Sequence, residues 1–121
     1  MPANFRHGSL ESIILTTLWS MEERGEYKNS VKDVFDSLQK DESQTRAYTT
    51  IKTVMDRLFE KKVLLRFKQG RKFYYRTAYS NNEIVVKSLI ELSNRYCNGD
   101  LARLGKIIDT VVEKQNCLVN A

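Results

Sequence analysis

Between residues 63 and 77 the spacing of apolar residues changes from a helical period to alternation. Aromatic and aliphatic residues stand on both sides of the turn Gln69-Gly70-Arg71, in the runs 63–68 and 72–77. Alternating apolar residues around a glycine-containing turn are typical of a β-hairpin. The chain is therefore expected to combine one small β-element with helices.

Three amphipathic segments precede this hairpin. Apolar residues recur every three or four positions in residues 10–24, 31–40 and 49–62, which predicts a helix in each segment. Ser9 is positioned to begin the first helix and Gly25 to end it. The third helix is expected to bury the stripe Ile51, Val54, Met55, Leu58 and Phe59.

Two more helices are predicted after the hairpin, at residues 82–97 and from Asp100 onward, with Asn98-Gly99 between them. Their apolar stripes are too broad for isolated surface helices, so a second copy of the chain is expected to cover them. The alternative is that both helices fold back on the core of their own chain. The residues assigned to dimerisation are Ile84, Leu89, Leu92, Tyr96, Leu101, Leu104, Ile108 and Val111.

Positive charge is concentrated in one quarter of the sequence. Ten basic and two acidic residues lie between Arg46 and Arg76, a net charge of +8, while the rest of the chain carries −3. Such a segment favours a polyanionic partner. A solvated basic surface without a partner is the alternative that charge alone leaves open.

The order of elements is that of a winged helix, so the predicted fold is mostly α with a small β-hairpin wing. Residues 9–78 are expected to form a winged-helix DNA-binding domain, and residues 79–121 a helical dimerisation segment. In this fold the third helix enters the major groove of DNA and the wing contacts the backbone. The residues expected to contact DNA are Thr49, Thr50, Lys52, Thr53, Arg57, Lys68, Arg71 and Lys72.

Two other functions stay open at this point. Winged helices also serve as protein-interaction modules without DNA contact, although such modules usually lack a basic stripe on both the third helix and the wing. Cys97 and Cys117 could make the protein a thiol-switched or metal-switched DNA-binding sensor. An enzyme is not expected, because no glycine-rich phosphate loop is present and the one histidine leaves serine and cysteine without an evident base.

Two runs carry a resemblance to a known family: Ala47-Tyr-Thr-Thr-Ile-Lys-Thr-Val-Met-Asp-Arg-Leu58 and Gly70-Arg-Lys-Phe-Tyr-Tyr75. With the opening segment 10–19, they resemble the BlaI/MecI/CopY family of bacterial penicillinase and copper-response repressors, over about residues 9–112. The resemblance implies a homodimer that represses a gene from a palindromic operator on double-stranded DNA. The signal that would release the repressor from DNA stays open, and it could be an inducer, a protease or thiol chemistry.

The same resemblance implies that Thr49, Thr50, Lys52 and Thr53 face bases or adjacent phosphates, and that Arg71 is the basic residue of the wing tip. Some copper-response members bind metal through paired Cys-x-Cys motifs. These motifs are absent, so neither a metal site nor a cofactor is expected. The apolar runs are too short to span a bilayer, and two cysteines are too few for a disulfide scaffold, so a cytoplasmic protein without membrane contact is expected.

Overall fold

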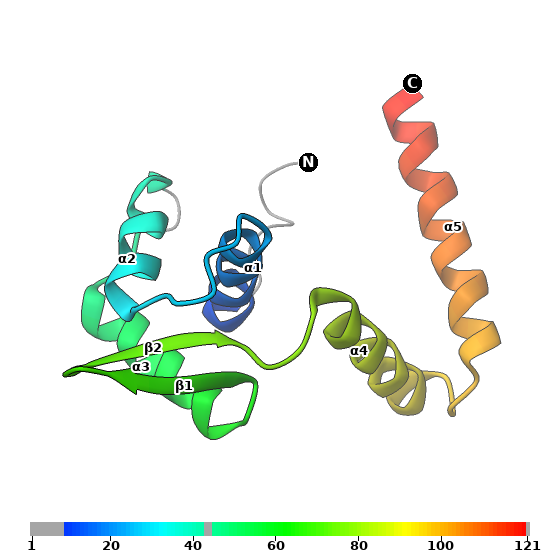
Figure 1. Cartoon of the computed structure of the whole chain (residues 1–121). Helices are drawn as coiled ribbons and strands as arrows, with labels where there is room; N and C mark the ends of the chain where they lie inside the picture. Colours follow the sequence, from blue (N-terminus) through cyan, green and yellow to red (C-terminus); the bar gives the residue numbers. More distant parts are fainter. Residues whose placement is uncertain (1–8, 43–44, 121) are drawn as a thin grey trace. The chain divides into compact units, whose positions relative to one another are not determined.

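The first two helices begin and end at the residues that local capping chemistry favours. The computed structural model describes residues 9–42 and 45–120, with side chains as far as residue 117 (Figure 1). Helix α1 spans Leu10–Glu23, and the Ser9 hydroxyl accepts a hydrogen bond from the Ser12 amide at its start. Helix α2 spans Val31–Gln39 and begins with a complete capping box between Ser30 and Asp33.

Helix α3 spans Tyr48–Glu60 and ends in a left-handed residue that is not glycine. Lys62 has φ +67°, and the amides of Lys62 and Val63 donate to the carbonyls of Phe59 and Leu58. This is the hydrogen-bond pattern of a Schellman motif. Helix α1 ends in the same pattern, with Gly25 in the left-handed position.

The predicted hairpin is present as two antiparallel strands, β1 (Leu64–Gln69) and β2 (Lys72–Thr77). Of the two turn residues, Gly70 has a positive φ of 65° and Arg71 does not, as in a type II′ turn. A third short segment extends this sheet, because the backbone of Asn29 forms an isolated bridge with Tyr75.

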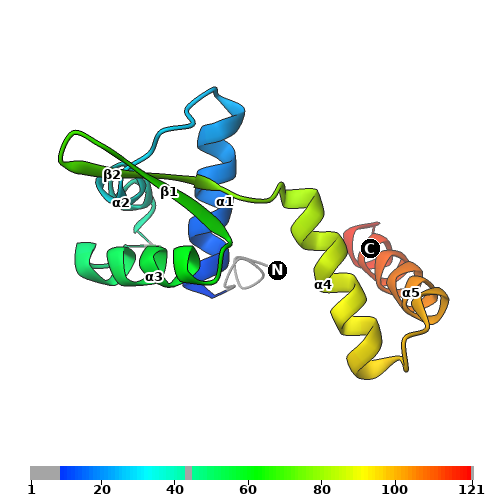
Figure 2. The ribbon, with the colours of Figure 1, turned by 60° about the horizontal axis from the view of Figure 1, so that its bottom comes forward.

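One hydrophobic core joins α1, α2, α3 and the base of the hairpin. Figure 2 shows these helices and the hairpin from a second side. Fully buried side chains come from each element, and they include Ile14, Leu18, Val34, Ile51, Met55, Leu58 and Leu64. The predicted stripe of α3 is buried as expected, except that Phe59 is only partly buried at the core's edge.

Two hydrogen-bonded ties join α1 to the segment around the end of β2. The Trp19 indole donates to the Tyr79 carbonyl at 3.0 Å. The Glu22 carboxylate accepts from both the amide and the hydroxyl of Thr77. These contacts fix the end of the wing to the first helix.

The chain divides into two compact units, with the boundary between Asn81 and Asn82. The second unit holds most of α4 (Asn81–Tyr96) and all of α5 (Leu101–Asn120). The Asp100 carboxylate accepts from the Arg103 amide at 3.1 Å at the start of α5. In the described part of the chain, five helices and one hairpin in this order confirm the predicted fold class, and helix ends differ from expectation by one or two residues. The functions assigned to residues 9–78 and 79–121 stay predictions.

Candidate nucleic-acid interface

Most of the polar face of α3 is exposed. Thr49, Thr50, Lys52, Thr53 and Arg57 are all exposed, while the opposite face of the helix packs in the core. The Thr53 hydroxyl donates to the Thr49 carbonyl at 2.9 Å and keeps its lone pairs for a further partner. The helix therefore presents short hydroxyls and two long cations, Lys52 and Arg57, to solvent.

Within residues 9–42 and 45–120, no side chain caps the start of α3. Ala47 is the N-cap residue, and the first turn contains no acidic residue. The first amides of a helix lack intrahelical partners and carry the positive end of the helix dipole. An uncapped start flanked by Thr49 and Thr50 is compatible with an approaching phosphate or base edge.

Asp56 is the acidic residue at the centre of this face. Its carboxylate accepts from Lys52 Nζ at 3.0 Å and from the Tyr75 hydroxyl at 3.0 Å, and Arg66 Nη1 lies 3.7 Å away. Burial raises the pKa of Asp56, but the hydrogen bonds from Lys52 and Tyr75 and the charges of Lys52 and Arg66 outweigh burial. The pKa of Asp56 is thus below its ordinary value of 3.8.

The pKa values of the two groups that donate hydrogen bonds to Asp56, Lys52 and Tyr75, are raised. The hydrogen bond to Asp56 and its negative charge raise the pKa of Lys52 above 10.5, so the amine stays protonated at neutral pH. Burial raises the pKa of the Tyr75 hydroxyl, and Asp56 raises it further, so this group stays a hydrogen-bond donor.

A second acidic residue, Glu11 of α1, holds the cations at the other end of α3. Its carboxylate lies 3.0 Å from Lys61 Nζ and 4.0 Å from Arg57 Nη1. The carboxylate that reaches Arg57 and Lys61 therefore belongs to α1, which packs beside α3, and not to α3 itself.

Three exposed cations of the wing have no acidic partner among the described residues. Lys68, Arg71 and Lys72 are exposed at and beside the turn. Within the described residues none of the three has an ion pair, and Lys68 Nζ lies 5.7 Å from the centroid of the Phe73 ring. The structure thus places all eight residues predicted to contact DNA on the surface of α3 and the hairpin.

Sequence reasoning missed Asp56, Arg66 and Tyr75 as members of this site. The spacing of Lys52 and Asp56 is a detectable signal, because residues four apart in a helix are neighbours. Arg66 and Tyr75 are directly opposite each other across the hairpin, and their approach to α3 depends on how the hairpin packs. No local sequence pattern encodes that packing.

The second unit exposes most of the residues predicted for dimerisation. Tyr96 is 67% exposed and Leu101 52%, and Leu92, Ile108 and Val111 are exposed as well. Ile84 and Leu89 are partly buried, and Leu104 is buried within the single chain. Among the described side chains of this unit, the buried ones are Ser93, Cys97 and Leu104.

Comparison with known proteins decides the family. The family model described as "Penicillinase repressor" matches residues 7–117. The chain belongs to the penicillinase repressor family. This confirms the resemblance stated above, and it confirms the expectation of a non-enzymatic protein, because the family consists of transcriptional regulators.

Two curated relatives of this penicillinase repressor family member are named "Transcriptional regulator BlaI", from two strains of Mycobacterium tuberculosis (CDC 1551/Oshkosh and ATCC 25618/H37Rv). Each is 29% identical to this chain over 86 residues. The match covers 71% of this chain but only 58% of each relative, so the chain spans little more than half of their length in the comparison.

The cysteines of this penicillinase repressor family member lie in different environments. Cys97 is buried near the end of α4, and Cys117 is exposed on α5. In residues 9–42 and 45–120, no three acidic, histidine or cysteine side chains gather in a way that would hold a metal ion. The lone histidine, His7, lies outside the described residues. Across the described helices, none combines the length and apolar character needed to cross a membrane.

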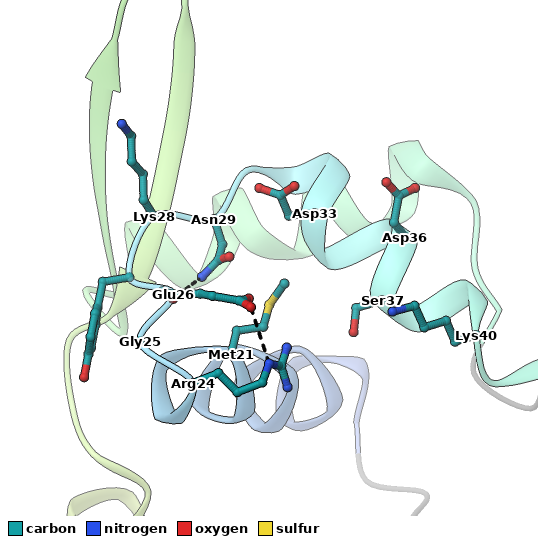
Figure 3. A pocket seen from close by; sticks show the side chains of 11 residues that line it. Met21, Arg24, Gly25, Glu26, Lys28, Asn29, Asp33, Asp36, Ser37 and Lys40 are labelled. Carbon is teal, nitrogen blue, oxygen red and sulfur yellow. Dashed lines mark hydrogen bonds and ion pairs between the residues drawn. The ribbon is translucent and has the colours of Figure 1, made fainter.

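A polar hollow of about 520 Å³ lies between the end of α1, the loop that follows and α2 (Figure 3). Most of its charged groups are already engaged with neighbours. Arg24 pairs with Glu26 at 3.4 Å, Asp36 pairs with Lys32 at 3.2 Å, and Asp33 caps α2. None of the eight residues predicted to contact DNA lines this hollow.

Proposed function

We propose that this chain is a cytoplasmic transcriptional repressor that binds a palindromic operator on double-stranded DNA as a homodimer. Helix α3 enters the major groove, and the hairpin contacts the flanking backbone. One observation carries the proposal. Exposed polar and basic side chains cover α3 and the wing tip, which are the two elements that a winged helix uses on DNA. Membership of the penicillinase repressor family supports the same function.

The proposed interface divides its work between two groups of residues. Thr49, Thr50, Lys52 and Thr53 face base edges or the adjacent phosphates from the first turns of α3. Arg57 and the wing cations Lys68, Arg71 and Lys72 neutralise phosphates. Contacts to base edges give sequence specificity, whereas contacts to phosphates give affinity that depends on salt.

A second copy of the chain is proposed as the partner of α4 and α5. A unit of about forty residues with so few buried side chains has too little core to be stable alone. The apolar side chains that it exposes are Val85, Val86, Ile90, Leu92, Tyr96, Leu101, Ile107, Ile108, Val111 and Val112. A patch of this kind marks an interaction surface, and a two-fold axis would place two copies of α3 on one operator.

The experiment that tests this function is selection of bound sequences from a random duplex library at near-physiological salt, with the full chain. We expect a palindrome with half-sites about one helical turn apart, roughly 34 Å. The variant Ile108→Lys, which places a charge on the exposed apolar face of α5, serves as the matched control and should recover single half-sites with lower affinity.

Recovery of no motif, with weak binding that disappears as salt rises, would contradict the proposal. The basic surface would then be nonspecific, and a protein-interaction module would be the better description.

A further inference from the structure

Asp56 joins α3 to both strands of the wing. One carboxylate oxygen accepts from Lys52 of the same helix. The other accepts from the hydroxyl of Tyr75 on β2 and lies 3.7 Å from the guanidinium of Arg66 on β1. A single acidic side chain within the most basic part of the sequence thus contacts three elements of the proposed DNA interface.

Two of its partners are held in place by packing. The Arg66 guanidinium lies 4.0 Å from the ring centroid of Phe59 and 4.6 Å from that of Phe73, so it is placed between two aromatic rings. Tyr75 is buried, and its backbone pairs with Asn29. The carboxylate of Asp56 is therefore fixed from the side of the wing.

The third partner is more exposed to solvent. The Lys52 side chain is 55% exposed, and Asp56 provides its one ion pair within the described residues. A lysine side chain loses considerable rotamer entropy when it is ordered, so an ion pair that orders it beforehand lowers the cost of a later contact. Lys52 is thus held over the exposed face of α3 by a carboxylate that the wing positions.

We propose that Asp56 is a specificity-determining positioning residue, which holds Lys52 for a base contact and keeps it from pairing freely with phosphates. The inference rests on the proposed DNA-binding function. Phosphates occur at every site, so a fixed negative charge on the interface lowers affinity for all sequences. Only an operator that offers Lys52 a base-edge acceptor compensates for this cost. Asp56 therefore widens the gap in affinity between the operator and random DNA.

The test compares the affinities of full-length variants for the selected operator and for a random duplex over a range of salt concentrations. Asp56→Asn keeps the size of the side chain and an oxygen that accepts from Tyr75, but it removes the charge. Freeing Lys52 for one phosphate should steepen the salt slope for random DNA by about 0.9 and raise that affinity about fivefold at roughly 150 mM salt. Operator affinity should rise less or fall, so the ratio of the two affinities decreases.

Glu60→Gln is the matched control, because it removes one negative charge one turn further along α3. Glu60 is exposed and has no hydrogen bond or ion pair within the described part of the chain. Its removal should leave the ratio of operator to random affinity unchanged. An equal effect of Asp56→Asn and Glu60→Gln on that ratio would overturn the inference, because Asp56 would then be only a background charge.

Two further variants separate position from charge. Asp56→Glu keeps the charge but displaces the carboxylate, so it should keep random affinity low while operator affinity falls. In a Lys52→Ala background, Asp56→Asn should no longer change the ratio, and an undiminished change there would also overturn the inference.

Failure of the proposed function and failure of this inference are distinguishable. If the unmodified protein showed no preference for any duplex, the proposed function itself would fail. A preference that Asp56→Asn leaves intact would refute the role of Asp56 alone.

Discussion

The carboxylate of Glu22 accepts hydrogen bonds from both the amide and the hydroxyl of Thr77, at 2.8 and 2.5 Å. Glu22 lies in the last turns of α1, and Thr77 is the final residue of β2. Both groups are partly buried, so these bonds are shielded from water. The pair fixes the base of the wing to the first helix.

Loss of the Glu22–Thr77 pair should destabilise the winged-helix unit more than most single substitutions of partly exposed residues do. We expect Glu22→Ala to lower the free energy of unfolding by about 3 kcal/mol, because two hydrogen bonds to a charged acceptor are lost and the Thr77 amide is left without a partner. Urea-induced unfolding followed by circular dichroism measures this. Glu23→Ala changes an exposed neighbour on the same helix and should cost less than about 0.5 kcal/mol; equal losses for both variants would contradict the prediction.

Lys52→Ala and Arg71→Ala should weaken DNA binding in different ways. Lys52→Ala is expected to cost roughly 1–3 kcal/mol at the operator and less on random DNA, because a base contact is lost. Arg71→Ala should weaken binding to all sequences alike and reduce the salt slope by about 1, because a phosphate contact is lost. Fluorescence anisotropy with both duplexes at several salt concentrations distinguishes the two patterns. Equal losses on both duplexes for Lys52→Ala would refute its role in reading bases.

A charge placed on the exposed apolar face of α5 should disrupt the dimer. Ile108→Lys buries an unpaired ammonium in the proposed interface, which is strongly unfavourable. Sedimentation equilibrium should show a shift from dimer toward monomer at micromolar concentration. Thr110→Lys adds the same charge to an exposed polar position on the same helix, and its average molar mass in solution should stay that of the dimer. A dimer that survives Ile108→Lys would place the interface elsewhere.

The end of α3 offers a pair of substitutions with opposite effects. Lys62 holds a left-handed conformation that costs a non-glycine residue about 1 kcal/mol, so Lys62→Gly should raise the free energy of unfolding by up to about that amount. Lys61 has φ −77°, where glycine adds backbone flexibility and also removes the ion pair with Glu11, so Lys61→Gly should lower stability. Thermal unfolding of both variants measures the signs, and a loss of stability in Lys62→Gly would contradict the account of this helix end.

The lowered pKa of Asp56 predicts how its contribution to stability depends on pH. A carboxyl group whose pKa is lower in the folded state stabilises the fold above its ordinary value of 3.8, and this contribution disappears as pH falls through that value toward the folded pKa. We expect Asp56→Asn to be about 1 kcal/mol less stable than the unmodified protein at pH 7, and the difference to shrink between pH 4 and 3. Unfolding by urea at a series of pH values measures it. A difference that stays constant down to pH 3 would show that ionisation of Asp56 does not stabilise the fold.

Most of the fold follows from local signals in the sequence. The stripes of α1, α2 and α3 and the alternation around Gly70 identify the elements, because burial of one face imposes a period on each. The ends of the helices follow from capping residues such as Ser30. The left-handed conformation of Lys62 does not follow from the sequence, because this position after a helix usually holds glycine and tertiary packing can hold another residue there.

The site was predictable only in its outward-facing part. Thr49, Lys52 and Arg71 are identifiable because their elements have one buried face and one exposed face. The acids that organise the cations are not, since Glu11 reaches Lys61 across fifty positions of sequence and Tyr75 reaches Asp56 across nineteen. Such pairings depend on how helices and hairpin pack together, which no local pattern contains.

The ties between α1 and the end of β2 bear on the order in which the protein matures on the ribosome. Trp19 and Tyr79 are sixty positions apart, and Glu22 and Thr77 fifty-five. The ribosome synthesises all of α1, α2 and α3 before the residues that fasten the wing leave the exit tunnel. Domains generally fold as whole units during synthesis. The nascent protein therefore acquires its complete fastened wing only after Tyr79 has emerged, when translation of the second unit is already under way.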